Sequence, residues 1–205
     1  MGYKSLEARM KPTVHGVGYL GGNLDLKSTH NGKLCKIYTQ WYSMIVRCYN
    51  EKYHIRFPTY IGCYVSDEFK DYSKWREWYD NYSYKQDDWH LDKDLLVKGN
   101  KVYSRETCVF LPKLINMALV TRYNNRGEYL IGVCWSKTNN AFKAQISKNK
   151  GAPEYLGFFK TEVEAFNAYK KAKEEYLKEL ADKYKDLLDP RAYEALYNYT
   201  VDIDD

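Results

Sequence analysis

The sequence predicts an α+β fold that begins with a helical region and ends with a three-stranded antiparallel sheet plus one helix. Three observations support this prediction. Apolar residues recur at helical spacing in segments 35–53 and 67–82. Segment 89–117 then follows the order strand, turn, strand, helix. Segment 128–159 holds the patterns of short strands, and a helix-capping sequence follows at 161–164.

The composition excludes several classes of protein. The chain has 205 residues, of which 44% are hydrophobic and 29% charged, so it can bury a core and global disorder is excluded. No apolar run reaches the roughly eighteen residues of a membrane-spanning helix, so we expect no membrane partner. Segment 1–11 lacks an apolar stretch, so we expect no secretory signal. Five cysteines without a CxxC pair favour free thiols in a cytoplasmic protein over a zinc ribbon or disulfide framework.

Charge and aromatic content favour a polyanionic partner without requiring one. Segment 122–160 carries seven Lys or Arg against two Glu, whereas segment 186–205 carries six acidic residues against one Arg. A basic stretch before an acidic tail is common in chains that bind nucleic acids. The chain also has 22 Tyr, a residue suited to cores, interfaces and bases alike. A mildly basic pI near 8.7 also fits proteins without such a role.

The N-terminal half is predicted to be a loop-rich arm followed by helices. Segment 1–34 contains the order GxGxxG, but no strand of βαβ type precedes it, so we expect a turn-rich arm rather than a nucleotide site. Segment 57–65 suggests a loop and a short strand around its proline. The two helices at 35–53 and 67–82 present apolar stripes, and we expect their tryptophans to be core residues. The stripes consist of Ile37, Trp41, Met44, Ile45 and Cys48, and of Phe69, Tyr72, Trp75 and Tyr79, with Trp78 also in the core.

The strand at 89–97 carries the strongest candidates for catalysis or metal binding. His90, Asp92 and Asp94 alternate along it and would share a face. Asn100 lies in the following turn at 98–101, and Asn116 lies in a helix after the strand at 107–111, with Pro112 at its first position. Imidazole can act as a base near neutral pH, and carboxylate and amide oxygens suit magnesium or manganese. The pattern fits a one-metal phosphodiesterase, but any solvated strand face can show it too.

The C-terminal half is predicted to form a sheet covered by a helix. Strands at 129–135 and 141–147 would form a hairpin, and a turn at 148–153 would lead to a third strand at 155–159. Thr161 and Glu164 then form a capping box for a long helix. The last segment, including 193–199, is expected to be a weakly packed tail.

Several motifs resemble phage-type HNH endonucleases. They are HLDKDLL at 90–96, GNK at 99–101, YSRETCVFLP at 103–112 and IN at 115–116, with WYSMIVRCY at 41–49, GCYVSDEF at 62–69 and HGVGY at 15–19 upstream. The resemblance implies a ββα-metal unit that hydrolyses DNA with a divalent metal.

The residue roles follow from this resemblance. It assigns His90 as the catalytic base and Asp92 and Asn116 as metal ligands. Asp94 would be a further ligand, and Asn100 a supporting group. The chain has Lys93 where the family has its base His, and Thr107 where it has a loop Asn. A protonated lysine is a poor base but a phosphate partner, so Lys93 is predicted as a second supporting group.

Residues 128–182 resemble the APETALA2-type DNA-binding domain. The shared motifs are GVCW at 132–135, AFKAQI at 141–146, YLGFF at 155–159 and TEVEAFNAY at 161–169. The resemblance implies that the sheet enters the major groove of double-stranded DNA. The residues implied for DNA contact are Trp135, Lys137, Asn139, Lys143, Gln145, Lys148 and Lys150.

The sequence therefore predicts four parts: a Gly-rich arm at 1–34, an HNH-like domain at 35–121, an APETALA2-like domain at 128–182 and an acidic tail at 186–205. Two functions remain open. The chain would be a phage-encoded, DNA-binding endonuclease in the cytoplasm of a bacterial host. Alternatively, it would be a catalytically degenerate relative that regulates DNA or inhibits a host defence protein.

Overall fold

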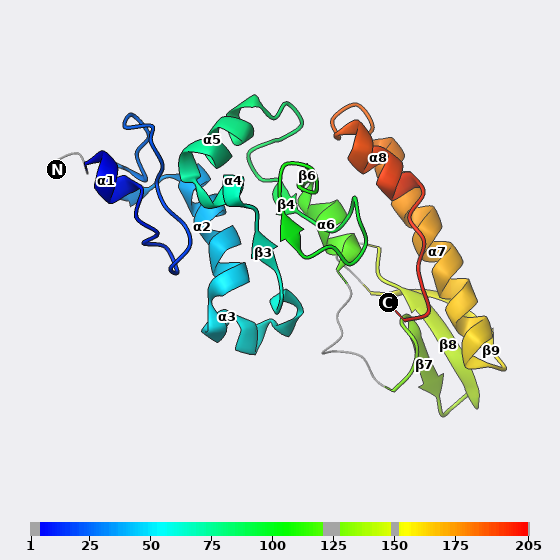
Figure 1. The fold of residues 1–205 in the computed structure, drawn as a ribbon. Helices are drawn as coiled ribbons and strands as arrows, with labels where there is room; N and C mark the ends of the chain where they lie inside the picture. Colours follow the sequence, from blue (N-terminus) through cyan, green and yellow to red (C-terminus); the bar gives the residue numbers. More distant parts are fainter. Residues whose placement is uncertain (1–4, 121–127, 149–151, 205) are drawn as a thin grey trace. The chain divides into compact units, whose positions relative to one another are not determined.

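The computed structural model describes residues 5–120, 128–148 and 152–204. The chain is a mixture of helices and small sheets, which confirms the α+β class (Figure 1). It divides into two compact units. The first comprises Met1–Lys85 with Leu91–Val109, and the second comprises Gln86–His90 with Phe110–Asp205.

The first unit is mainly helical. Its helices are α1 (Leu6–Arg9), α2 (Lys36–Tyr49), α3 (Glu51–Arg56), η1 (Pro58–Tyr60), α4 (Asp67–Lys70) and α5 (Tyr72–Asn81). Its strands form two short pairs, and the pair β3–β5 is parallel. They are β1 (Thr29–His30), β2 (Lys33–Leu34), β3 (Tyr64–Val65) and β5 (Val102–Tyr103).

Aromatic side chains form the core of this unit. Trp41, Phe69 and Trp75 are fully buried, as the two apolar stripes predicted. The indole of Trp41 donates a hydrogen bond of 2.7 Å to the carbonyl of Phe69, so its one polar atom is paired inside the core. Tyr72 packs edge-on against Tyr38, with ring centroids 5.2 Å apart. The prediction that the tryptophans serve the core is confirmed.

Each of the two predicted helices is divided by a capping residue. Asn50 adopts an extended conformation and its side chain accepts a hydrogen bond from the backbone N–H of Tyr53, so α2 ends and α3 begins there. Asp71 likewise caps α5 through Ser73 and Lys74. Short polar side chains compete with the helix for backbone N–H groups. The single helices predicted at 35–53 and 67–82 are therefore wrong at these positions.

A buried arginine organises the glycine-rich arm. Arg9 is 6% exposed, and its guanidinium donates to the carbonyls of Gly21, Leu20 and Asn23. It also donates to the carbonyl of Leu26 at 3.1 Å. The arm is thus held by one side chain that satisfies the carbonyls of its turns.

The short strands β4 (His90–Asp92) and β6 (Val109–Leu111) form a two-stranded sheet, and the division between the units passes through both strands. The predicted strand at 89–97 is thus only three residues long. After Asp92 the chain forms a loop, in which the backbone N–H groups of Asp94 and Leu95 donate to the Asp92 side chain instead of to a neighbouring strand. Pro112 is the N-cap of α6 (Lys113–Leu119) rather than its first residue.

The second unit contains the predicted antiparallel sheet and its helix. Strands β7 (Val133–Ser136), β8 (Ala141–Ile146) and β9 (Glu154–Phe159) are antiparallel in the order β7-β8-β9. Helix α7 (Glu162–Lys183) packs against the sheet, as Figure 1 shows. The predicted capping box is confirmed, because Thr161 and Glu164 exchange hydrogen bonds of 3.1 and 3.2 Å.

The C-terminal segment is packed, which contradicts the prediction of a weakly packed tail. Residues Pro190–Tyr197 form helix α8, which packs against α7. Leu196 is fully buried and Val201 is 3% exposed. The backbone N–H of Val201 donates to Glu174 of α7 at 2.9 Å. The high density of acidic residues hid the apolar face of this helix.

No helix within the three described segments combines the length and the apolar character needed to cross a membrane.

Truncating Leu196 tests the packing of α8. We expect Leu196→Ala to lower the free energy of unfolding by about 2–5 kcal/mol, because it leaves a cavity at a fully buried position. The matched control is Leu187→Ala, at a side chain that is 47% exposed, which should have a much smaller effect. Denaturant unfolding measures both variants, and equal losses would contradict the packed segment.

Candidate functional site

The carboxylate of Asp92, at the end of β4, holds the backbone of the loop that follows. Asp92 Oδ1 accepts hydrogen bonds from the backbone N–H groups of Asp94 (3.1 Å) and Leu95 (2.8 Å). Aspartate often makes such turns because its short side chain reaches the backbone two or three residues later. The predicted metal ligand Asp92 therefore has a clear structural role in the first unit.

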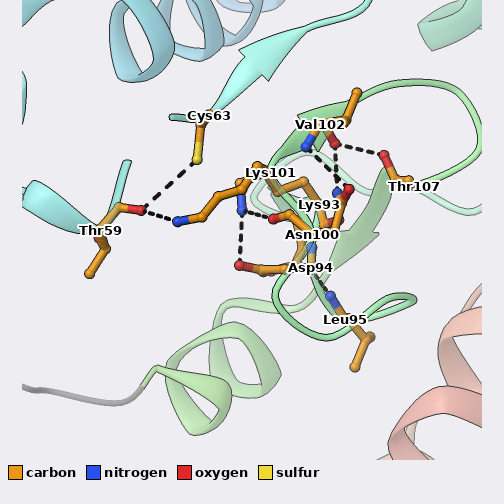
Figure 2. A network of polar contacts seen from close by, with 10 residues as sticks. Thr59, Cys63, Lys93, Asp94, Leu95, Asn100, Lys101, Val102 and Thr107 are labelled. Carbon is orange, nitrogen blue, oxygen red and sulfur yellow. Dashed lines mark hydrogen bonds and ion pairs between the residues drawn. The ribbon is translucent and has the colours of Figure 1, made fainter. Parts of the chain in front are cut away.

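Lys93 lies inside the same loop. Its side chain is 8% exposed, and its ammonium donates to Asp94 Oδ2 at 2.9 Å and to the carbonyl of Asn100 at 2.8 Å. Asn100 returns a hydrogen bond from its amide to the carbonyl of Lys93 at 2.6 Å. Figure 2 shows this reciprocal pairing across the loop. The phosphate-binding role expected of Lys93 is not supported, because its charge is satisfied within the loop.

The polar network continues into neighbouring parts of the first unit. Asn100 also donates to the carbonyl of Val102 (2.7 Å), which Thr107 Oγ1 contacts as well (2.8 Å). Lys101 donates to the carbonyl of Thr59 at 2.9 Å (Figure 2). Thr107 thus helps to hold β5. Four of the residues predicted around the catalytic site take part in contacts that hold this loop: Asp92, Lys93, Asp94 and Asn100.

The pKa values of two groups in and near the loop agree with a role in stability. Burial and, less strongly, the nearby charge of Asp94 together raise the pKa of Asp92 to about 6, against the opposing effect of the backbone N–H groups. Burial also raises the pKa of the Cys108 thiol well above its usual range. This cysteine therefore stays protonated near neutral pH and is a poor nucleophile.

His90 and Asn116 meet in the second unit. Asn116 Nδ2 lies 3.2 Å from His90 Nδ1, and His90 is exposed at the start of β4 while Asn116 lies in α6. The structure therefore brings the predicted base and the predicted helix ligand together. When Nδ1 accepts this hydrogen bond, the imidazole carries its proton on Nε2.

These contacts do not fit a ready-made divalent-metal site. Asp92 and Asp94 bind groups of their own loop, and the amide of Asn116 binds His90. Among the described side chains, no group of three or more His, Cys, Asp or Glu residues is placed to hold a metal ion. Magnesium and manganese need several oxygen ligands that converge on one point. We therefore derive no metal-dependent step, and the predicted metal roles stay predictions.

The sheet of the second unit has a packed face and an open face. Ala144 and Ile146 of β8 are at most 1% exposed. Side chains alternate along a strand, so Lys143 and Gln145 lie on the opposite, open face. Both are partly exposed. The structure thus brings together two of the residues predicted to contact DNA.

Trp135 is separated from these two residues. It pairs across the strands with Phe142, and the two rings lie 4.8 Å apart in an edge-to-face arrangement. Phe142 alternates with Lys143 and shares the face of Ala144. Trp135 therefore belongs to the packed face, and we no longer include it in the interface predicted from the sequence.

Three more of the predicted DNA-contact residues, Lys137, Asn139 and Lys148, lie around the edges of the sheet. Lys137 and Asn139 are exposed in the β7–β8 turn, where Asn139 donates to Ser136 Oγ at 2.9 Å. Lys148 forms an ion pair with Glu154 at 3.0 Å. Lys150 lies outside the described residues.

Two aromatic residues of the open face were missed by the sequence analysis. Phe158 pairs with Lys143, and Tyr155 pairs with Gln145, so both rings share the face of these polar residues. The available signal was Gly157, because a glycine within a strand pattern often marks a bulge.

Comparisons with protein-family models, curated proteins and solved structures found no match for this chain. The likeness to HNH and APETALA2-type domains therefore rests on the motifs alone.

The pKa of Asp92 predicts a pH-dependent stability. Its folded-state pKa of about 6 exceeds the ordinary aspartate pKa of 3.8, so the folded state retains a proton that the unfolded state releases. The free energy of unfolding should therefore fall, by at most about 3 kcal/mol, as the pH rises from about 4 to about 6. Asp92→Asn keeps an oxygen acceptor and removes the charge, so this fall should shrink.

Denaturant unfolding across this pH range measures the effect. Asp88→Asn, which removes an exposed carboxylate before β4, is the matched control and should keep the wild-type pH profile. An unchanged pH profile in Asp92→Asn would show that this carboxyl is not the responsible group.

Proposed function

We propose that this chain is a DNA-binding protein that contacts duplex DNA with the open face of its three-stranded sheet. The observation that carries the proposal is the placement of Lys143 and Gln145 on the face opposite the buried Ala144 and Ile146. Lysine binds phosphates or guanine edges, and glutamine can bind adenine through two hydrogen bonds.

The charge distribution supports this choice of partner. Segment 122–160, which includes the whole three-stranded sheet, carries seven basic residues against two acidic ones. Exposed Lys137 lies at the tip of the β7–β8 hairpin, beyond the strand that carries Lys143. Positive charge along a sheet attracts the phosphate backbone and gives affinity that falls as salt rises.

We further propose that the HNH-like segment serves stability rather than hydrolysis. Lys93 occupies the position of the family's base, and its ammonium is bound to Asp94 and Asn100. The contact between His90 and Asn116 is the one observation that favours the nuclease alternative. That alternative would need a magnesium or manganese ion bound by side chains that already have partners.

The DNA proposal predicts the effect of changing the open face. Lys143→Ala with Gln145→Ala should weaken binding to a mixed-sequence duplex about fivefold or more, because a base-edge contact contributes about 1–3 kcal/mol. Losing one phosphate contact should also reduce the slope of log affinity against log salt by about 1. Fluorescence anisotropy over roughly 50–200 mM salt measures both quantities.

Lys171→Ala is the matched control, because it removes the same charge from an exposed position on α7. It should leave the affinity near that of the wild type. An equal loss in this control would show that binding depends on overall charge and would contradict a role for the sheet face.

The structural role of the HNH-like segment predicts the result of a plasmid-nicking assay. With magnesium or manganese, the wild-type protein should nick DNA no faster than the His90→Ala, Asp92→Ala double variant. Binding of the same plasmid is recorded in parallel, so that inactivity is not confused with lack of binding. Metal-dependent nicking that disappears in the double variant would establish the nuclease instead.

A further inference from the structure

A bulge in β9 places two aromatic rings on the open face of the sheet. Ala144 pairs with Gly157 and Gln145 pairs with Tyr155, so Leu156 is an extra residue without a partner on β8. In a regular strand, residues three apart point to opposite faces. The extra residue reverses this alternation, and Tyr155 and Phe158 consequently share one face.

The backbone at this bulge depends on glycine. Gly157 has a φ of 138°, a conformation that L side chains rarely adopt. A Cβ at this position would also lie 3.2 Å from Cζ of Phe159. The chain thus maintains an unusual backbone at the point that aligns the two rings.

The two rings form an exposed aromatic surface. Their centroids lie 5.2 Å apart with planes inclined at 59°, and Tyr155 and Phe158 are 55% and 42% exposed. With planes inclined in this way, the rings do not form a slot that could hold a flat molecule between parallel rings, so an aromatic ligand would stack on the exposed face of one of them. Large exposed apolar groups that lie together typically mark a binding surface.

The polar neighbours of the rings indicate the chemistry of the occupant. Lys143 lies directly across from Phe158, and Gln145 lies directly across from Tyr155. A ring beside a lysine matches a nucleotide, in which a flat base is joined to a negatively charged phosphate. In a duplex, neighbouring bases cover one another's faces. The rings therefore need bases that have left the stack.

We propose that Tyr155 and Phe158 stack against unpaired bases, so that the preferred DNA contains a short single-stranded stretch. This inference rests on the proposed DNA binding by the same sheet face. Lys143 then binds the backbone beside the stacked base, and Gln145 contributes hydrogen bonds. Stacking of this kind tolerates different base sequences because every base has a π-face.

The test compares three DNA ligands of one sequence: a blunt duplex, the same duplex with a short gap, and the single strand. The fluorescent base 2-aminopurine is placed in the gap, and its emission falls when it stacks on an aromatic ring. The wild-type protein should quench it and bind the gapped duplex about tenfold or more tightly than the blunt duplex.

Variants separate the rings from the rest of the sheet. Tyr155→Leu with Phe158→Leu should lose the quenching and the preference for the gapped over the blunt duplex. Tyr155→Phe retains the ring and should retain both. Tyr197→Leu removes a ring that is 40% exposed on α8 and should have no effect.

The outcomes distinguish the two proposals. Equal binding of the blunt and gapped duplexes by the wild type would overturn the stacking inference and leave the DNA-binding proposal standing. Failure to bind any of the three DNA ligands would overturn both. Tighter binding of a single-stranded RNA of the same sequence would overturn the assignment to DNA.

Discussion

The packing of α7 against one face of the β7–β8–β9 sheet is the constraint on which the functional interpretation depends. Buried Ala144 and Ile146 define that face, and strand alternation then assigns Lys143 and Gln145 to the other. The capping box at Thr161 starts the helix directly after β9, so the connection is short. The inner residues of β8 are therefore assigned either to the core or to a surface that a ligand can reach.

The loop after β4 shows how the same residue types can serve chemistry or stability. A buried ammonium or carboxylate needs partners, because the loss of water is costly unless hydrogen bonds replace it. Lys93, Asp94 and Asn100 satisfy one another, and Asp92 satisfies two backbone N–H groups. A carboxylate and an amide used in this way hold a turn in place, and a metal ion would have to displace those contacts.

Elements that repeat a regular spacing of apolar residues could be predicted from the sequence, whereas local interruptions of those elements could not. The stripe through Trp41 and the capping box at Thr161 were predictable because a helix repeats its spacing and begins with a recognisable cap. The break at Asp71 was missed because the apolar spacing continues across it, from Phe69 to Tyr72. The bulge before Gly157 was missed because only the partner strand reveals which residue is unpaired.

For the candidate site, the sequence could name candidate residues but could not determine their partners. His90 and Asn116 meet as the motif implied. In contrast, Trp135 lies on the packed face because it pairs with Phe142, a contact that depends on strand register. The measurement that tests the central claim most directly is a map of backbone amide NMR shifts on titration with duplex DNA. The account predicts shifts concentrated on β8 and β9, around Lys143 and Phe158, whereas shifts confined to α7 and α8 would contradict it.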